Sequence, residues 1–116
     1  MEAKPVLLAF VGSDWCATCI RFDKKVIHDP LFKEYSKDHL VLLLADFPQQ
    51  KNLAPDIVKK NDSLAAIYNP EGVFPKFILV NSNTPGGFKQ VAYTTQTASE
   101  FISDVKKKLS ALRSYE

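Results

Sequence analysis

Cysteine is scarce in this chain of 116 residues, which contains only Cys16 and Cys19. Small secreted proteins that are held together by several disulfides need more cysteines than this, so that class of protein is excluded. The two cysteines therefore have to be accounted for individually.

Long hydrophobic runs are also absent. The longest, PVLLAFVG and LVLLLADF, fall far short of the roughly 20 residues that cross a bilayer, so we expect no membrane span. The N-terminal stretch MEAKPVLLAF lacks the basic segment, apolar stretch and small-residue cleavage site of a secretory leader. Because the chain begins almost at its first predicted strand, we expect that it could be a processed or trimmed domain.

Neither sign of charge predominates, since the chain has 15 basic and 13 acidic residues and a net charge of +2. This balance argues against a nucleic-acid partner. The chain contains no repeat, linker or low-complexity tract. Its length and its hydrophobic content of 46% predict one packed domain over residues 1–116.

Apolar runs and amphipathic stretches predict the element order β-α-β-α-β-β-α. The first two strands, joined through helices, should be parallel, and the last two should form an antiparallel hairpin around a turn at 81–87. We therefore expect an α/β fold with a central mixed four-stranded sheet flanked by helices. The predicted strands are residues 5–11, 39–47, 74–80 and 88–94.

Four helical segments are predicted, and two of them have clear N-terminal signals. Asp29 is a good N-cap before Pro30, and Thr97 with Glu100 forms a capping box. The helix over 54–69 has an interrupted apolar stripe at Ile57, Val58, Leu64 and Ile67. The predicted helices begin at Cys16, Asp29, Ala54 and Thr97.

The tetrapeptide CATC lies where the first strand ends and a helix begins. A helix start carries unpaired N–H groups and partial positive charge, which stabilise a thiolate and lower the pKa of Cys16. Cys19 follows one turn later on the same face, close enough for a disulfide after a small adjustment. This arrangement predicts that Cys16 is a nucleophile and Cys19 a resolving thiol in disulfide exchange.

Three alternative roles for the pair are less well supported. A purely structural disulfide is disfavoured because so small a loop removes little entropy from the unfolded chain. A zinc site is disfavoured because the only histidines, His28 and His39, do not have zinc-finger spacing. Covalent haem attachment is excluded because Ile20, and not histidine, follows the second cysteine.

The chain resembles the thioredoxin superfamily in the motif WCATC after the first buried strand, in the helix that follows, and in GVFPKFILV around the third strand. The resemblance extends from Lys4 to Leu112. It implies a thioredoxin-like fold in which Pro75 is cis and faces the cysteine pair, while Phe74 offers backbone groups to a bound peptide. Independently, a proline before a central strand is restricted to strand starts, turns or cis bonds.

The same resemblance implies a substrate surface beside the cysteines. Trp15 is either a half-exposed aromatic that contacts substrate or a packing residue at the strand end, and the two interpretations are compatible. Ala17 and Thr18, between the cysteines, complete the predicted substrate-binding residues.

The sequence departs from thioredoxin at two places. Thioredoxin has a buried aspartate six residues before its first cysteine, which helps to move the proton of the resolving thiol, and here this position is Phe10. Water, Asp14, Lys24 or Asp46 could take that role for Cys19, with solvated surface positions as the alternative for the three charged residues. The dipeptide between the cysteines lacks the histidine of strong oxidases, which favours a reductase.

We therefore predict a thiol-disulfide oxidoreductase that reduces protein disulfides without bound cofactor or metal. Its partners would be protein or peptide disulfides and a redox protein that recycles the pair, and the chain would be a monomer. The alternatives are a disulfide oxidase or isomerase, and a non-catalytic peptide-binding module. The resemblance is closest to bacterial thioredoxin-like proteins of the periplasm, which predicts that location, with the cytoplasm as the alternative.

Overall fold

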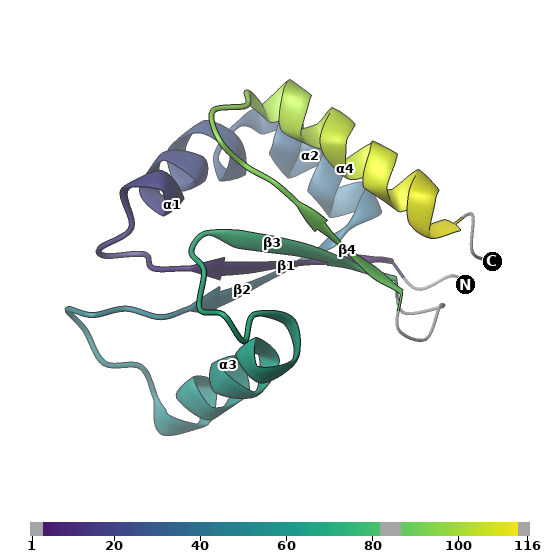
Figure 1. Cartoon of the computed structure of the whole chain (residues 1–116). Coiled ribbons are helices and arrows are strands. Elements are labelled where there is room, and N and C mark those ends of the chain that lie inside the picture. The colour runs from purple at the N-terminus through teal and green to yellow at the C-terminus, as the bar shows by residue number, and fades with distance from the viewer. Residues whose placement is uncertain (1–3, 82–86, 114–116) are drawn as a thin grey trace.

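A computed structural model of the chain describes residues 4–81 and 87–113. They form a four-stranded sheet with helices on both faces (Figure 1). The strands are β1 (Val6–Val11), β2 (Val41–Asp46), β3 (Lys76–Val80) and β4 (Phe88–Val91). The helices are α1 (Ala17–Phe22), the π-helical turn η1 (Asp23–Ile27), α2 (Pro30–His39), α3 (Pro55–Tyr68) and α4 (Ala98–Arg113).

The strand order is β2-β1-β3-β4. Strands β1 and β2 are parallel, with Val11 opposite Asp46 at their ends, whereas β3 is antiparallel to both β1 and β4. These pairings confirm the predicted α/β fold and its mixed sheet. Most of the predicted turn, residues 82–86, lies outside the described residues.

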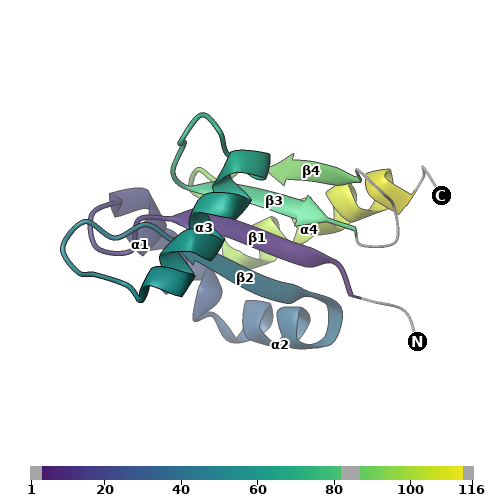
Figure 2. The same ribbon diagram turned by 90° about the horizontal axis from the view of Figure 1, so that it is seen from below.

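The sheet separates two hydrophobic clusters. Figure 2 shows α3 on the near side of the sheet, and α2 and α4 on its far side. Helices α1, α2 and α4 cover the larger cluster, in which the rings of Phe22, Phe77 and Phe101 meet edge to face or tilted. Helix α3 covers the other face, where Phe10 and Ile78 are buried. Successive side chains of each strand thus point to opposite faces of the sheet.

The first helix differs from the prediction, because it changes its hydrogen-bonding pattern after α1. The backbone N–H of His28 donates to the carbonyl oxygen of Asp23 over 3.1 Å, which is the spacing of a π-helix. Apolar periodicity cannot distinguish one π turn from an α-helical turn. The helix therefore ends at Ile27, before Asp29 caps α2 by accepting from Leu31 N.

Helix α3 forms where it was predicted, but most of its apolar stripe does not pack. Leu64 lies against the sheet, and the buried Asn61 donates from Nδ2 to the carbonyl oxygen of Asp46 over 3.0 Å. A polar bond therefore helps to hold this helix at the end of β2. The exposed members of the stripe are Ile57, Val58 and Ile67.

Helix α4 begins with the predicted capping box. Thr97 N donates to Glu100 Oε1 over 2.9 Å, and Glu100 N donates to Thr97 Oγ1 over 3.2 Å. At 16 residues α4 is the longest of the described helices. None of the helices within residues 4–81 and 87–113 combines the length and apolar character that a bilayer crossing needs.

Candidate active site

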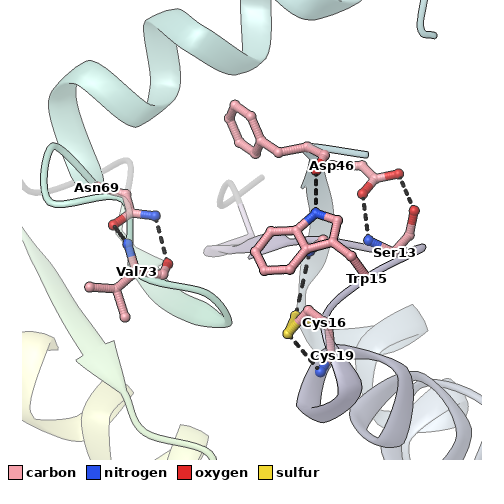
Figure 3. The surroundings of a disulfide bond; sticks show 9 residues. Ser13, Trp15, Cys16, Cys19, Asp46, Asn69 and Val73 are labelled. Atoms are coloured by element: carbon pink, nitrogen blue, oxygen red, sulfur yellow. Dashed lines mark hydrogen bonds between the residues drawn. A yellow bond between two sulfur atoms is a disulfide. The ribbon is translucent and has the colours of Figure 1, made fainter. Parts of the chain in front are cut away.

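The two cysteines are joined by a disulfide at the start of α1 (Figure 3). Cys16 is the N-cap residue of this helix, with extended backbone angles, and its Cα lies 5.2 Å from that of Cys19. Its Sγ accepts from Cys19 N over 3.2 Å, while Cys19 Sγ accepts from Gly12 N over 3.5 Å. Each sulfur thus has a backbone N–H donor, which would stabilise negative charge on it.

The two sulfur-bearing residues differ in accessibility. Cys16 keeps 7% of its surface exposed and Cys19 only 3%. Ala17 is exposed and Thr18 half-buried. Cys16 is therefore slightly more accessible to an incoming disulfide than Cys19.

Trp15 is both exposed and packed. The side chain is 38% exposed, its ring meets that of Phe74 edge to face at 5.5 Å, and its Nε1 donates to the carbonyl oxygen of Phe47 over 2.7 Å. A Cβ at Gly12 would overlap the indole ring. The absence of a side chain at position 12 therefore makes room for the tryptophan beside the disulfide.

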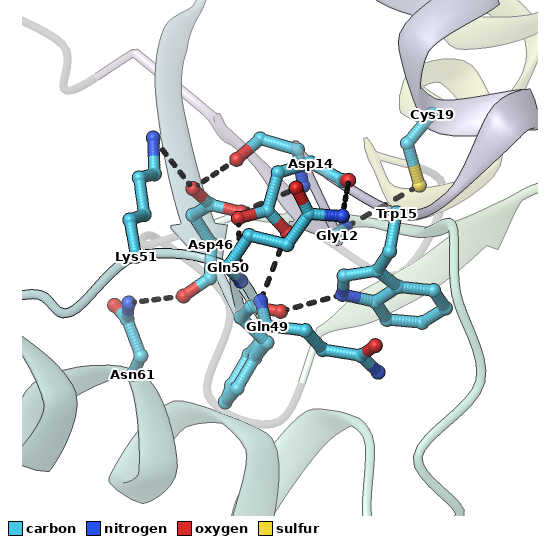
Figure 4. A network of polar contacts seen from close by, with 11 residues as sticks. Gly12, Asp14, Trp15, Cys19, Asp46, Gln49, Gln50, Lys51 and Asn61 are labelled. Carbon is cyan, nitrogen blue, oxygen red and sulfur yellow. Dashed lines mark hydrogen bonds and ion pairs between the residues drawn. The ribbon is translucent and has the colours of Figure 1, made fainter.

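The loop before the cysteines is tied to the loop after β2 by several polar contacts (Figure 4). Ser13 donates from N and Oγ to the two carboxylate oxygens of Asp46, over 2.9 Å and 2.5 Å. The Asp14 carboxylate accepts from the backbone N–H groups of Gln49 and Gln50, both over 2.9 Å. These bonds fix the segment that carries Trp15 and the cysteine pair.

The same contacts change the acidity of Asp14. The backbone N–H of Gln49 lowers its pKa below the ordinary value of 3.8, and Gln50 N–H and the Lys51 charge act in the same direction, against the opposing effect of desolvation. The ionised carboxylate is therefore the form that holds the two loops together.

The loop that carries Phe74 and Pro75 approaches the cysteines from the other side, and the peptide bond between them is cis. Buried Asn69 donates from Nδ2 to Val73 O over 2.9 Å and accepts from Val73 N over 3.0 Å. Gly72 has a φ of +69°, which disfavours any other residue. Asn69 and Gly72 thus shape the turn that presents Phe74.

The structure also shows supporting residues that sequence reasoning missed. Trp15 and Phe74 pack against each other directly, and Phe47 packs against Phe74 at 5.3 Å. Neither Asn69 nor Phe47 was singled out. The stretch Asn69-Pro70-Glu71-Gly72 at a helix end was the available signal of a tight turn.

No metal site accompanies the disulfide. Within residues 4–81 and 87–113 there is no group of three or more histidine, cysteine or acidic side chains that could hold an ion. His28, one of the two histidines in the sequence, contacts Asp23 through Nε2 at 3.1 Å.

Comparison with known proteins agrees with this arrangement. Residues 1–82 match the family described as Thioredoxin-like. The disulfide bond reductase DsbH of Chlamydia pneumoniae is 31% identical over 111 residues, which are 93% of this chain and 64% of that protein. The chain thus spans slightly less than two thirds of that relative's length.

Solved structures give the same picture. A DsbH oxidoreductase superposes with a TM-score of 0.79 at 30% identity, covering 92% of this chain and 73% of the other. The C-terminal domain of Neisseria meningitidis DsbD, in the oxidised form, superposes with a TM-score of 0.59 at 18% identity, covering 90% and 80%. At that identity, the second likeness shows the fold alone.

Proposed function

Because the chain belongs to the Thioredoxin-like family, we propose that it is a thiol-disulfide oxidoreductase that reduces disulfides in proteins. The observation that carries the proposal is the Cys16–Cys19 disulfide at the start of α1, in which Cys16 is the more exposed residue. The similarity to a protein named as a disulfide bond reductase supports the direction.

The reaction begins with the reduced pair. The Cys16 thiolate attacks one sulfur of a substrate disulfide and forms a mixed disulfide, and the other substrate sulfur leaves as a thiolate. Cys19 then attacks Cys16 Sγ, restores the internal disulfide and releases the second substrate sulfur. The substrate gains two electrons, which the cysteine pair loses.

The substrate would lie across the surface formed by Trp15, Ala17, Thr18, Phe74 and Pro75. Trp15 and Phe74 offer aromatic area on one side of Cys16, supported by their mutual contact. Backbone groups of Phe74 are available for an extended peptide. The expected substrate is therefore a protein segment that can lie extended next to its disulfide.

The dipeptide between the cysteines supports a reductase. Neither Ala17 nor Thr18 carries a charge that would stabilise the reduced form as strongly as in an oxidase. We place the chain in the bacterial periplasm, as a monomer that a separate redox protein keeps reduced. Equilibration with glutathione buffers tests the direction: a potential near that of thioredoxin, about −270 mV, supports reduction, and one near −120 mV supports oxidation.

Reduction of insulin disulfides by dithiothreitol-recycled protein tests the activity itself. Cys16→Ser should abolish turnover, because no nucleophile remains. The matched variant Cys19→Ser should accumulate a mixed disulfide between Cys16 and substrate, visible by mass spectrometry under non-reducing conditions. Turnover that persists in Cys16→Ser would remove the proposal.

A further inference from the structure

We infer that Asp46 accepts the proton that Cys19 must lose before it attacks the mixed disulfide. The inference rests on the proposed function, since it assigns a residue to the second step of that reaction. Phe10 occupies the position at which thioredoxin has the aspartate that helps to move this proton, so another group must take that role here. The evidence for Asp46 is a cavity beside Cys19.

Cys19 and Asp46 line the same cavity, which has a volume of about 210 Å³. Ser13 and Asp23 add polar atoms to its wall. A water molecule occupies about 30 Å³ and needs two or more polar partners, so this cavity has both the room and the groups for water to relay a proton. A carboxylate and a thiol thus line one compartment, whose wall also includes the apolar side chains of Val11, Ile20, Phe22, Ile27 and Leu44.

The sheet explains why Asp46 reaches this compartment. Asp46 is opposite Val11 in the parallel pair β1·β2, and residues that face each other in register point to the same side of a sheet. Val11 also lines the cavity. Phe10 points to the opposite side, where it is fully buried and its ring stacks on that of Phe47 at 6.4 Å.

The other charged candidates fit less well. Neither Asp14 nor Lys24 lines the cavity. Asp23 does line it, but its side chain is 54% exposed and contacts His28. The Asp46 side chain is only 20% exposed.

The surroundings of Asp46 hold its carboxylate in place. Ser13 donates to both oxygens, which leaves each oxygen further lone pairs for water. Lys51 Nζ lies 3.9 Å from Oδ2, on the loop that follows β2. The charged groups near it are therefore Lys51 on one side and, across the cavity, Asp23 of η1 with its partner His28.

The π-helical turn supplies one wall of the cavity. Asp23 and Ile27, the first and last residues of η1, both line it. A π turn is wider than an α-helical turn and is often found at functional sites. The irregular turn that follows α1 is thus part of the compartment that the proton would cross.

The step balances in protons and electrons. The Cys19 thiol gives its proton through water to the Asp46 carboxylate, and the resulting thiolate attacks Cys16 Sγ. The bond between Cys16 Sγ and the substrate sulfur breaks as the Cys16–Cys19 bond forms, so the substrate leaves as a thiolate. Asp46 then returns the proton to solvent.

Stopped-flow mixing separates this step from the first. Reduced protein, in slight excess, is mixed with an aromatic disulfide whose released thiol absorbs visible light. The first thiol appears in a second-order phase as Cys16 captures the reagent, and the second appears in a first-order phase as Cys19 resolves the mixed disulfide. Asp46→Asn should keep the first rate and slow the second at neutral pH by on the order of 10-fold or more.

Three comparisons make the test specific. The difference in first-order rate between Asp46→Asn and the wild type should shrink as pH rises, because hydroxide then deprotonates Cys19 directly. Asp46→Glu, which keeps a carboxylate, should recover much of the rate. Asp23→Asn, which tests the other carboxylate of the cavity, should slow this phase much less than Asp46→Asn does. Thermal unfolding shows that each variant is folded.

The inference is overturned if Asp46→Asn resolves as fast as the wild type at neutral pH, or if Asp23→Asn slows this phase as much as Asp46→Asn does. Loss of the first-order phase in the wild type would instead contradict the proposed function, whatever Asp46 does. The two failures are therefore distinguishable in one experiment.

Discussion

Trp15 and Phe47, which are 32 residues apart in sequence, are joined by a hydrogen bond of 2.7 Å from the indole Nε1 to the backbone carbonyl oxygen. The bond holds an exposed aromatic ring beside the disulfide instead of leaving it free to rotate. Phe74 meets both rings, at 5.5 Å from Trp15 and 5.3 Å from Phe47. Three loops thus converge on one aromatic group next to Cys16.

Replacing Gly12 by alanine should displace this tryptophan, because the new Cβ would overlap the indole ring. We expect a loss of stability of about 1–3 kcal/mol and slower insulin reduction. Trp15 is the only tryptophan, so its fluorescence emission reports the displacement directly. Gly72→Ala is the matched control: space there is open, and only the positive φ is strained, so emission should not change. Unchanged emission in Gly12→Ala would contradict the steric argument.

Asn69→Ala should loosen the loop that presents Phe74 and Pro75, since it removes both hydrogen bonds to Val73. Two part-buried backbone groups of Val73 would lose their partners, at a cost of about 1–2 kcal/mol in the free energy of unfolding. Urea denaturation measures the stability, and steady-state kinetics should show a higher KM. Asn52→Ala, at an exposed position, is the comparison. Equal behaviour of the two variants would exclude the supporting role of Asn69.

The contribution of Asp14 to stability should depend on pH. Its pKa is lower in the folded protein than the ordinary value of 3.8, mainly through the N–H of Gln49, so the ionised form favours folding. The stabilisation is present above the unfolded pKa and disappears as pH falls through the folded one. Asp14→Asn should therefore be less stable than the wild type at pH 7, with the gap closing in acid. The same measurement on Asn52→Ala, an exposed position without a titrating side chain, should show no such closing gap.

Tyr93→Phe should leave stability unchanged or raise it by up to about 1 kcal/mol. The buried Tyr93 hydroxyl has no hydrogen-bond partner among the described residues, while its ring packs against Phe22 at 4.9 Å. Phenylalanine keeps the ring contacts and removes an unpaired polar group. Thermal denaturation checks this, and a clear loss of stability would mean that the hydroxyl is paired in solution.

Local signals predicted the architecture well. The capping box at Thr97, the N-cap at Asp29 and the buried runs around β1 and β2 each depend on nearby residues, so they can be recognised without the fold. The position of the disulfide followed in the same way, because a strand end and a helix start are adjacent in the sequence.

Contacts between distant segments could not be predicted in this way. Asp46 and Ser13 are 33 residues apart, and only the parallel register of β1 and β2 brings them together. Similarly, Asn61 resembled an ordinary polar residue of an amphipathic helix until its bond to the Asp46 carbonyl was visible. A side chain's partner across the sheet depends on strand order and register, which residue patterns specify only weakly.

The π-helical turn η1 has a consequence for sequence alignment. Because a π turn holds one residue more than an α-helical turn, it acts as a stored insertion between Cys19 and Asp29. Homologues whose helix is regular here should align with a one-residue gap inside Asp23–Ile27. Such a gap would identify homologues that lack the π-helical wall of the cavity beside Cys19.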